Sequence, residues 1–209
     1  MARPGRRLAD RSRLSAADMS RVAVFAGLIA VLGVPGSFAL FGNAVPVTLQ
    51  SMGILLCGAI LGARRGALAV LVLLALVATG LPLLAGGRGG LGVFAGPSVG
   101  YLAGWVAAAA VVGWLVERAG RRPALPWVLG ACLTGSAVVL VIGVPVQSFV
   151  TGVPLGETML ISAAFLPGDA AKAVFAAVVT TGTQRAYPAA APGARRVAAA
   201  DGPPAPGEG

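Results

Sequence analysis

One arginine stands among glycines in a stretch that interrupts two long apolar runs. Arg88 lies at the centre of the Gly-Gly-Arg-Gly-Gly sequence at 86–90, within the glycine-rich segment 80–101. Glycine has no Cβ, reaches positive φ without steric cost and lets the main chain come close to a ligand. A guanidinium in such a loop can pair with a planar anion such as a carboxylate. The stretch therefore predicts a loop at a membrane face that caps a small-molecule pocket.

A second group of ionisable side chains opens the last apolar run of the chain. Asp169 and Lys172 follow the dipeptide Pro167-Gly168 and are three residues apart, so on a helix they share one face. Proline suits the first turn of a helix, and an aspartate there is favoured by the positive end of the helix dipole. Ionisable groups inside a span cost about 2.5–3.5 kcal/mol each. Two interpretations stay open: a mutual ion pair that stabilises the helix start, or an acceptor and a donor offered to a polar ligand.

Gln50 is a polar side chain near the start of another apolar run. It follows the sequence Val-Pro-Val-Thr-Leu at 45–49, so we expect it close to the same membrane face. Its amide can hydrogen-bond either a ligand or a neighbouring helix, and the sequence does not separate these roles. Trp105 lies deeper in an apolar run. Two interpretations are also open for it: a core residue or a residue of the pocket wall.

Small residues recur in the first apolar run. Ala26 and Ala30 are four residues apart, beside Ala23 and Gly27. This spacing lets two transmembrane helices approach closely, which would make it a contact face for a partner helix. The same pattern also arises by chance in alanine-rich spans, so both interpretations are kept.

The composition points to a polytopic membrane protein. Of 209 residues, 57% are hydrophobic and 11% are charged, whereas a soluble domain carries about 25% charged residues. The sequence has no histidine, and its two cysteines, Cys57 and Cys132, lie inside apolar runs, as small buried hydrophobes do. A thiolate zinc site, a haem with histidine ligands and a Ser-His-Asp triad are thereby disfavoured. We expect no cofactor, and the chain has no nucleotide-binding P-loop for ATP hydrolysis.

Six apolar stretches are expected to be transmembrane helices, giving an all-α fold. A bilayer core about 30 Å thick needs roughly 20 helical residues. The six predicted spans are about 22–41, 47–63, 66–79, 97–116, 125–144 and 168–183, and an apolar approach at 159–166 is a further helical candidate.

The basic residues fix the expected orientation. The formal charge is +9, but the arginines lie in short segments beside apolar runs, so topology explains them better than nucleic-acid binding does. With six spans and a cytoplasmic amino terminus, fourteen of the sixteen basic residues fall on the cytoplasmic side, as the positive-inside rule requires. Arg88 and Lys172 are the two exceptions, which is a topological reason to treat both as functional.

The chain is then expected to have three parts. These are a basic cytoplasmic segment at 1–21, a six-helix substrate-binding membrane domain at 22–183, and a disordered cytoplasmic tail at 184–209. Both termini are expected in the cytoplasm of a multi-pass plasma-membrane protein. The predicted outer loops are 42–46, 80–96 and 143–167, and their length favours ligand entry from the outside.

Four motifs together resemble the BioY family, the biotin-binding S-components of energy-coupling factor transporters. They are VPVTLQ at 45–50, LGARRGALAVL at 61–71, GLPLLAGGRGGLGVFAGPSVGYLAGW at 80–105 and FLPGDAAKAV at 165–174. The resemblance covers roughly residues 20–183. The glycine-arginine loop followed by the Pro-Gly-Asp-x-x-Lys start of the last helix, in this order, is its most specific part.

The resemblance implies a six-helix bundle that binds biotin from the outside and delivers it inward. It implies partners: a transmembrane T-component and two cytosolic ATPases. It also implies that Arg88, Gln50, Asp169 and Lys172 bind substrate, and that the alanine pattern of the first helix contacts the T-component. Some members of the family use an asparagine from the third helix, and the range 66–79 has none, so which residue replaces it stays open.

Biotin chemistry agrees with these residue types. Arg88 can pair with its carboxylate, Asp169 can accept from a ureido N–H, and Lys172 can donate to the ureido carbonyl. The alternatives are an S-component for another small vitamin, a membrane enzyme using Asp169 and Lys172 as acid and base, and a purely structural subunit. No nucleophile–base constellation accompanies the pair, so we expect no enzymatic activity. The chain has two tyrosines and three tryptophans, which is little surface for stacking a more aromatic vitamin.

Overall fold

The regular elements in the described part of the chain are all helices. The structure is a computed structural model, and it describes residues 14–36, 44–120, 122–188 and 192. In these ranges no strand occurs; the extended pairing is limited to isolated bridge residues, including a bridge between Leu84 and Arg88. The helices are α2 (Ala16–Val31), α3 (Gln50–Leu61), α4 (Ala63–Ala78), the short 3-10 helix η1 (Leu91–Phe94), α5 (Val99–Arg118), α6 (Leu125–Thr151), α7 (Leu155–Ser162) and α8 (Phe165–Ala186).

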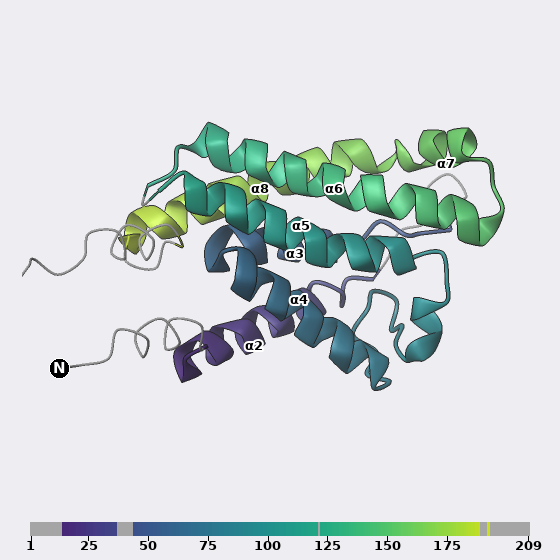
Figure 1. Ribbon diagram of the computed structural model, residues 1–209, viewed down its shortest axis with the longest axis horizontal. Helices are drawn as coiled ribbons and strands as arrows, with labels where there is room; N and C mark the ends of the chain where they lie inside the picture. Colours follow the sequence, from purple (N-terminus) through teal and green to yellow (C-terminus); the bar gives the residue numbers. More distant parts are fainter. Residues whose placement is uncertain (1–13, 37–43, 121, 189–191, 193–209) are drawn as a thin grey trace, which may run out of the picture.

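Helix α3 stands at the centre of the bundle. It contacts α2, α4, α5, α6 and α8. Helix α6 lies along α5 and also contacts α7 and α8 (Figure 1). Nine residues of the twelve-residue α3 are buried, which explains why its sequence is apolar all round rather than on one face.

Two predicted boundaries are wrong. The span predicted at 22–41 begins earlier and ends earlier, because Ser15 forms a capping box with Asp18 at the start of α2, and Pro35 and Gly36 follow its last turn. Gly36 has a φ of 91°, a left-handed conformation that does not continue a helix. Residues 37–43 lie outside the described residues.

The predicted outer loop at 143–167 is also wrong. Helix α6 continues through Pro145 to Thr151 and ends at Gly152, whose φ is 71°. Half of the remaining segment 152–167 is α7, and α8 begins at Phe165, so the helical candidate at 159–166 is confirmed in part. Proline inside a helix removes one N–H donor, but neighbouring helices can compensate within a membrane bundle, so Pro145 does not end α6.

Among the described residues, two helices, or three if a bent pair counts as one span, are long and apolar enough to cross a membrane. Helices α5 and α6 pass this test, and α7 with α8, bent by 48° at their break, is a third if the pair forms one span. Helices α2, α3 and α4 have 16, 12 and 16 residues, which is shorter than the roughly 20 residues that cross a bilayer upright.

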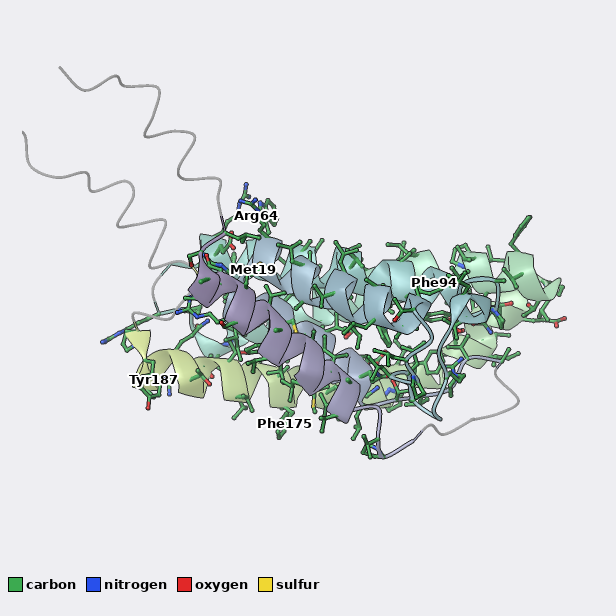
Figure 2. The ribbon with its side chains drawn as sticks, turned by 90° about the horizontal axis from the view of Figure 1, so that it is seen from below. Met19, Arg64, Phe94, Phe175 and Tyr187 are labelled. Atoms are coloured by element: carbon green, nitrogen blue, oxygen red, sulfur yellow. The ribbon has the colours of Figure 1, made fainter. Side chains whose placement is uncertain are left out.

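Basic side chains gather at one end of the bundle. Helix α2 begins there and α8 ends there, and Met19, Arg64 and Tyr187 all lie toward this end (Figure 2). Arg65 pairs with Asp18 over 3.1 Å, and Arg118 stacks 3.8 Å above the ring of Trp114. We call this the basic end; the loop after α4, the start of α5 and helix α7 form the opposite end (Figure 1).

Candidate ligand-binding site

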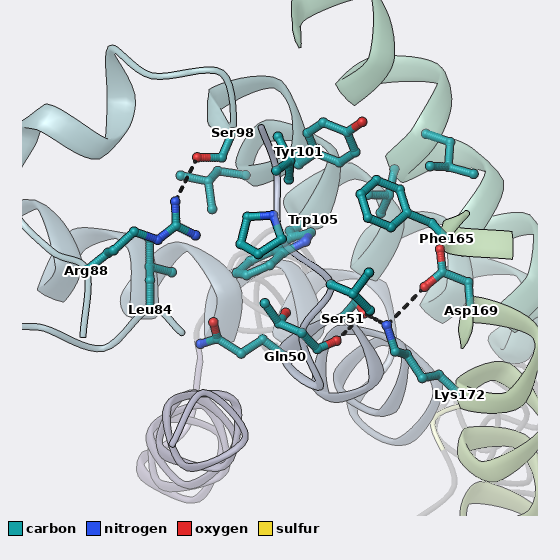
Figure 3. A pocket seen from close by; sticks show the side chains of 17 residues that line it. Gln50, Ser51, Leu84, Arg88, Ser98, Tyr101, Trp105, Phe165, Asp169 and Lys172 are labelled. Atoms are coloured by element: carbon teal, nitrogen blue, oxygen red, sulfur yellow. Dashed lines mark hydrogen bonds and ion pairs between the residues drawn. The ribbon is translucent and has the colours of Figure 1, made fainter. Parts of the chain in front are cut away.

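A cavity opens between the loop after α4 and helices α3, α5, α6 and α8. Its walls include all four residues singled out for substrate binding: Gln50, Arg88, Asp169 and Lys172. The empty space between the lining atoms is about 570 Å³, counting the part that opens to solvent. Arg88 approaches this space from one side, and Asp169 and Lys172 approach it from the other (Figure 3). The fold thus brings together residues that are more than a hundred positions apart in sequence.

Asp169 and Lys172 form the polar group on the α8 side. The Nζ atom of Lys172 lies 3.1 Å from Oδ1 of Asp169 and donates to Oγ of Ser51, on α3, over 3.0 Å. The two side chains are only 10% and 16% exposed. Both residues lie in the first turns of α8. Their three-residue spacing places the two side chains on one face of the helix. One carboxylate with unused lone pairs and one ammonium therefore face the cavity together.

Arg88 is held by the loop that carries it. Its Nε donates to the carbonyl of Ala85 over 3.2 Å, and Nη1 donates to Oγ of Ser98 over 3.3 Å. The main chains of Leu84 and Arg88 exchange two hydrogen bonds of 3.0 and 3.1 Å. The turn between them uses two glycines at 86–87 with φ of 78° and 71°, where a side chain would be strained. In the described residues Nη2 makes no hydrogen bond, which leaves a donor for an anionic ligand group.

Gln50 lines the cavity, but its amide bonds to main chain. It is 1% exposed; Nε2 donates to the carbonyls of Ile29 and Leu83, and Oε1 accepts from the N–H of Ala85 over 2.9 Å. Of the two roles left open by the sequence, the structure shows contacts with neighbouring protein segments.

Three aromatic rings form the apolar wall, and the sequence analysis did not assign two of them to the site. Tyr101, Trp105 and Phe165 line the cavity, and the rings of Tyr101 and Phe165 meet edge to face with centroids 6.0 Å apart. Tyr101 and Trp105 are four apart on α5, so they share a face, which is the one sequence signal that links them. Trp105 is 8% exposed and serves both as core and as pocket wall.

A buried network fixes the ring of Tyr101. Its hydroxyl donates to Oε1 of Gln147 over 2.8 Å and lies 3.3 Å from Oγ of Ser162. This joins α5 to α6 and α7. Gly143 allows the ring to sit there, because a Cβ at that position would lie 2.6 Å from Cδ1 of Tyr101.

The change Gly143→Ala is therefore expected to lower stability and to push the tyrosine ring toward the cavity. Overpacking of this kind costs about 1–3 kcal/mol. Thermal unfolding of the purified protein in detergent measures it. The control is Gly156→Ala in α7, where a Cβ meets nothing within 4 Å. Equal melting temperatures for Gly143→Ala and wild type would contradict the assigned packing.

The small residues of α2 divide between two faces. Ala26 is 3% exposed and belongs to the core, and Ala30 is partly buried against it. Ala23 and Gly27 are exposed, and a Cβ on Gly27 would meet nothing within 4 Å. The face of α2 that is open to another helix is therefore lined by Ala23 and Gly27, while Ala30 lies at its border.

Metal-ligating side chains and thiols were the remaining candidates for site chemistry. Among the residues that the structure describes, no three histidine, cysteine, aspartate or glutamate side chains form a metal-binding group. Cys57 and Cys132 are buried free thiols, which confirms their interpretation as small hydrophobes.

Comparison with known proteins gives one consistent result. The model of the BioY family matches residues 7–189. The chain is 41% identical to "Biotin transporter BioY" of Rhizobium etli, over 84% of this chain and 97% of that protein. It is 45% identical to "Biotin transporter BioY" of Rhodobacter capsulatus, over 78% and 90%. It is also similar to a crystal structure described as the S-component for biotin from an ECF-type ABC transporter, with a TM-score of 0.78, 28% identity, and coverage of 83% of this chain and 95% of that one.

Proposed function

The chain belongs to the BioY family, and we propose that it is a biotin transporter subunit whose substrate occupies the cavity between Arg88 and the Asp169–Lys172 pair. The observation that carries this proposal is the placement of charge: a lone cation on one side and an acceptor–donor pair on the other (Figure 3). Biotin has matching polar ends, a carboxylate and a ureido group. The relatives of this chain are named biotin transporters. These names do not favour the alternative of another vitamin, and they describe transporters rather than enzymes.

Each end of the ligand is assigned to named groups. Asp169 accepts from a ureido N–H, Lys172 donates to the ureido carbonyl, and Arg88 pairs with the carboxylate. The rings of Tyr101, Trp105 and Phe165 hold the thioether bicycle between these ends. Burial of apolar ligand surface adds about 25 cal/mol per Å², while the polar groups fix its orientation.

The proposed assembly includes an energising module. Because the sequence contains no P-loop, ATP hydrolysis by that route requires other subunits, and the solved relative is described as part of an ECF-type ABC transporter. We assign a transmembrane T-component and cytosolic ATPases as partners. For the contact with the T-component we propose the exposed face of α2, formed by Ala23 and Gly27 with Ala30 of the predicted pair at its border. The other predicted residue, Ala26, is 3% exposed and packs in the core of this structure.

The proposed topology places six spans in the plasma membrane with the basic end in the cytoplasm. Its support is the clustering of basic side chains at the end where α2 begins and α8 ends (Figure 2), as the positive-inside rule requires. The cavity lies toward the opposite end, so biotin enters from the outer side. The proposed parts stay 1–21, 22–183 and 184–209.

The change Arg88→Ala tests the proposed function. Loss of a hydrogen bond to a charged group costs about 1.5–3 kcal/mol, so biotin affinity should fall roughly 10- to 100-fold. Isothermal titration of the purified protein with biotin and with biotin methyl ester separates the causes. Wild type should bind the ester more weakly than biotin, and Arg88→Ala should bind both about equally.

Arg64→Ala is the matched control, because Arg64 is exposed at the basic end (Figure 2). It should bind both compounds as wild type does. Wild-type preference for biotin over its ester in Arg88→Ala would sink the assignment of the carboxylate to Arg88. Failure of wild type to bind biotin at all would sink the proposed function.

A further inference from the structure

We infer that Gln50 is a positioning residue: its buried amide clamps the arginine-bearing loop to the end of α2 and acts on the ligand only through Arg88. The consequence for ligand binding rests on the proposed function, whereas the clamp itself is a property of the ligand-free protein. Gln50 lies at the start of α3, between the two segments that it joins. In Figure 3 its amide points toward the loop side of the cavity, away from Lys172.

On the loop side, hydrogen bonds connect Gln50 to Arg88 through the main chain of Ala85. The amide donates to the carbonyl of Leu83 over 3.0 Å and accepts from the N–H of Ala85 over 2.9 Å. The carbonyl of the same Ala85 accepts from Nε of Arg88. Leu84, between the two contacts, is 2% exposed and pairs its main chain with Arg88. Gln50 therefore fixes the segment that in turn fixes the guanidinium.

On the helix side, the amide of Gln50 bonds to a carbonyl in the last turn of α2. Nε2 of Gln50 donates to the carbonyl of Ile29 over 3.2 Å. Helix α2 ends at Val31, and the N–H of Gly33 bonds to Ala30 rather than to Ile29. The last carbonyls of a helix lack partners within the helix, and here a side chain from α3 supplies one.

Gly33 makes room for the amide. A Cβ at this position would lie 3.0 Å from both Cδ and Nε2 of Gln50, which is tighter than ordinary contact. The amide is also enclosed, with the whole residue 1% exposed. Both N–H groups and one lone pair of the amide oxygen are thus used by main chain, which leaves no N–H for a ureido carbonyl.

Two variants remove the clamp in different ways. Gln50→Glu keeps the shape and the acceptor for Ala85, but it sets an oxygen against two carbonyl oxygens. Gln50→Met keeps the approximate size and removes every hydrogen bond. Hydrogen–deuterium exchange of the ligand-free protein should show the main-chain amides of Ala85 and Arg88 exchanging at least about tenfold faster in both variants.

The matched control is Gln184→Met. Gln184 is another buried glutamine whose Nε2 donates to a main-chain carbonyl, that of Ala59, but it contacts no part of the loop. Its loss is expected to lower global stability and to leave exchange at 80–90 unchanged. Unchanged exchange at Ala85 and Arg88 in both Gln50 variants overturns the clamp, whether or not the protein binds biotin.

Biotin titration then tests how the clamp acts. Gln50→Met should lose about as much affinity as Arg88→Ala, and the double variant should lose little more, because one residue works through the other. Losses that multiply in the double variant would show that Gln50 contacts the ligand directly and would overturn the positioning role. If wild type binds no biotin, the proposed function fails, while the exchange result still decides the clamp.

Discussion

Replacement of Asp169 by asparagine should lower biotin affinity by about a hundredfold. The asparagine has the same shape, but it replaces a charged acceptor by a neutral one, and a hydrogen bond to a charged group contributes about 1.5–3 kcal/mol. It also leaves the ammonium of Lys172, which is 10% exposed, without its carboxylate partner. Removal of one member of a buried charge pair costs about 2–5 kcal/mol. Titration of purified protein with biotin measures the loss.

The neutral double variant Asp169→Asn with Lys172→Met separates binding from stability. In Asp169→Asn alone, an unpaired buried charge should lower the melting temperature. The double variant has no unpaired charge, so its melting temperature should return toward that of wild type while biotin affinity stays low. The control is Glu157→Gln, because Glu157 is an exposed carboxylate on α7. Wild-type affinity in the double variant would show that the pair only stabilises the start of α8.

The charged part of this site was predictable from sequence for a physical reason. Ionisable side chains are costly in an apolar run, so Arg88, Asp169 and Lys172 stand out against their surroundings. The i, i+3 spacing then places the last two on one helical face, and the structure shows them in contact. Contrast in polarity, rather than any knowledge of tertiary contacts, made these residues visible.

The aromatic wall and the partners of Gln50 were not predictable in the same way. Tyr101 and Phe165 lie in apolar runs, so their residue types do not differ in polarity from those of their sequence neighbours. Their role arises when α5 and α8 meet around the cavity. Gln50 was visible as polar, but the direction of its amide depends on where α2 ends and how the loop folds back, and both are tertiary facts.

The wrong boundaries share a cause. Hydropathy continues past the end of α2 and past Pro145 in α6, so composition alone does not locate a helix end. Pro35 and Gly36 end α2 because the chain turns there, whereas Pro145 remains helical because the surrounding bundle supports it. The same residue type has opposite consequences in the two settings. The all-helical class, which depends only on composition and periodicity, is confirmed.

A close approach between α5 and the turn that joins α3 to α4 predicts a large effect on stability. Gly113 on α5 lies against the turn between α3 and α4, and a Cβ there would sit within van der Waals radii of the main chain at Gly62 and Ala63. One turn later, Oε1 of Glu117 accepts from the N–H of Ala63 over 2.9 Å. The glycine thus allows a close approach that the carboxylate then fixes, as small residues do in membrane bundles.

Gly113→Ala should therefore destabilise the protein by about 3 kcal/mol, the upper part of the range for overpacking, because the obstacle is main chain on a neighbouring element and cannot rotate away. For a protein of this length the melting temperature should fall by roughly 6–12 °C. Gly130→Ala is the matched control: it makes the same change within α6, where a Cβ meets nothing within 4 Å, so it should gain about 0.5–1 kcal/mol from better helix propensity. The opposite signs of two identical substitutions would locate the cost in the contact between α5 and the α3–α4 turn. A Gly113→Ala protein that melts with or above wild type would show that this turn does not pack on α5 as described.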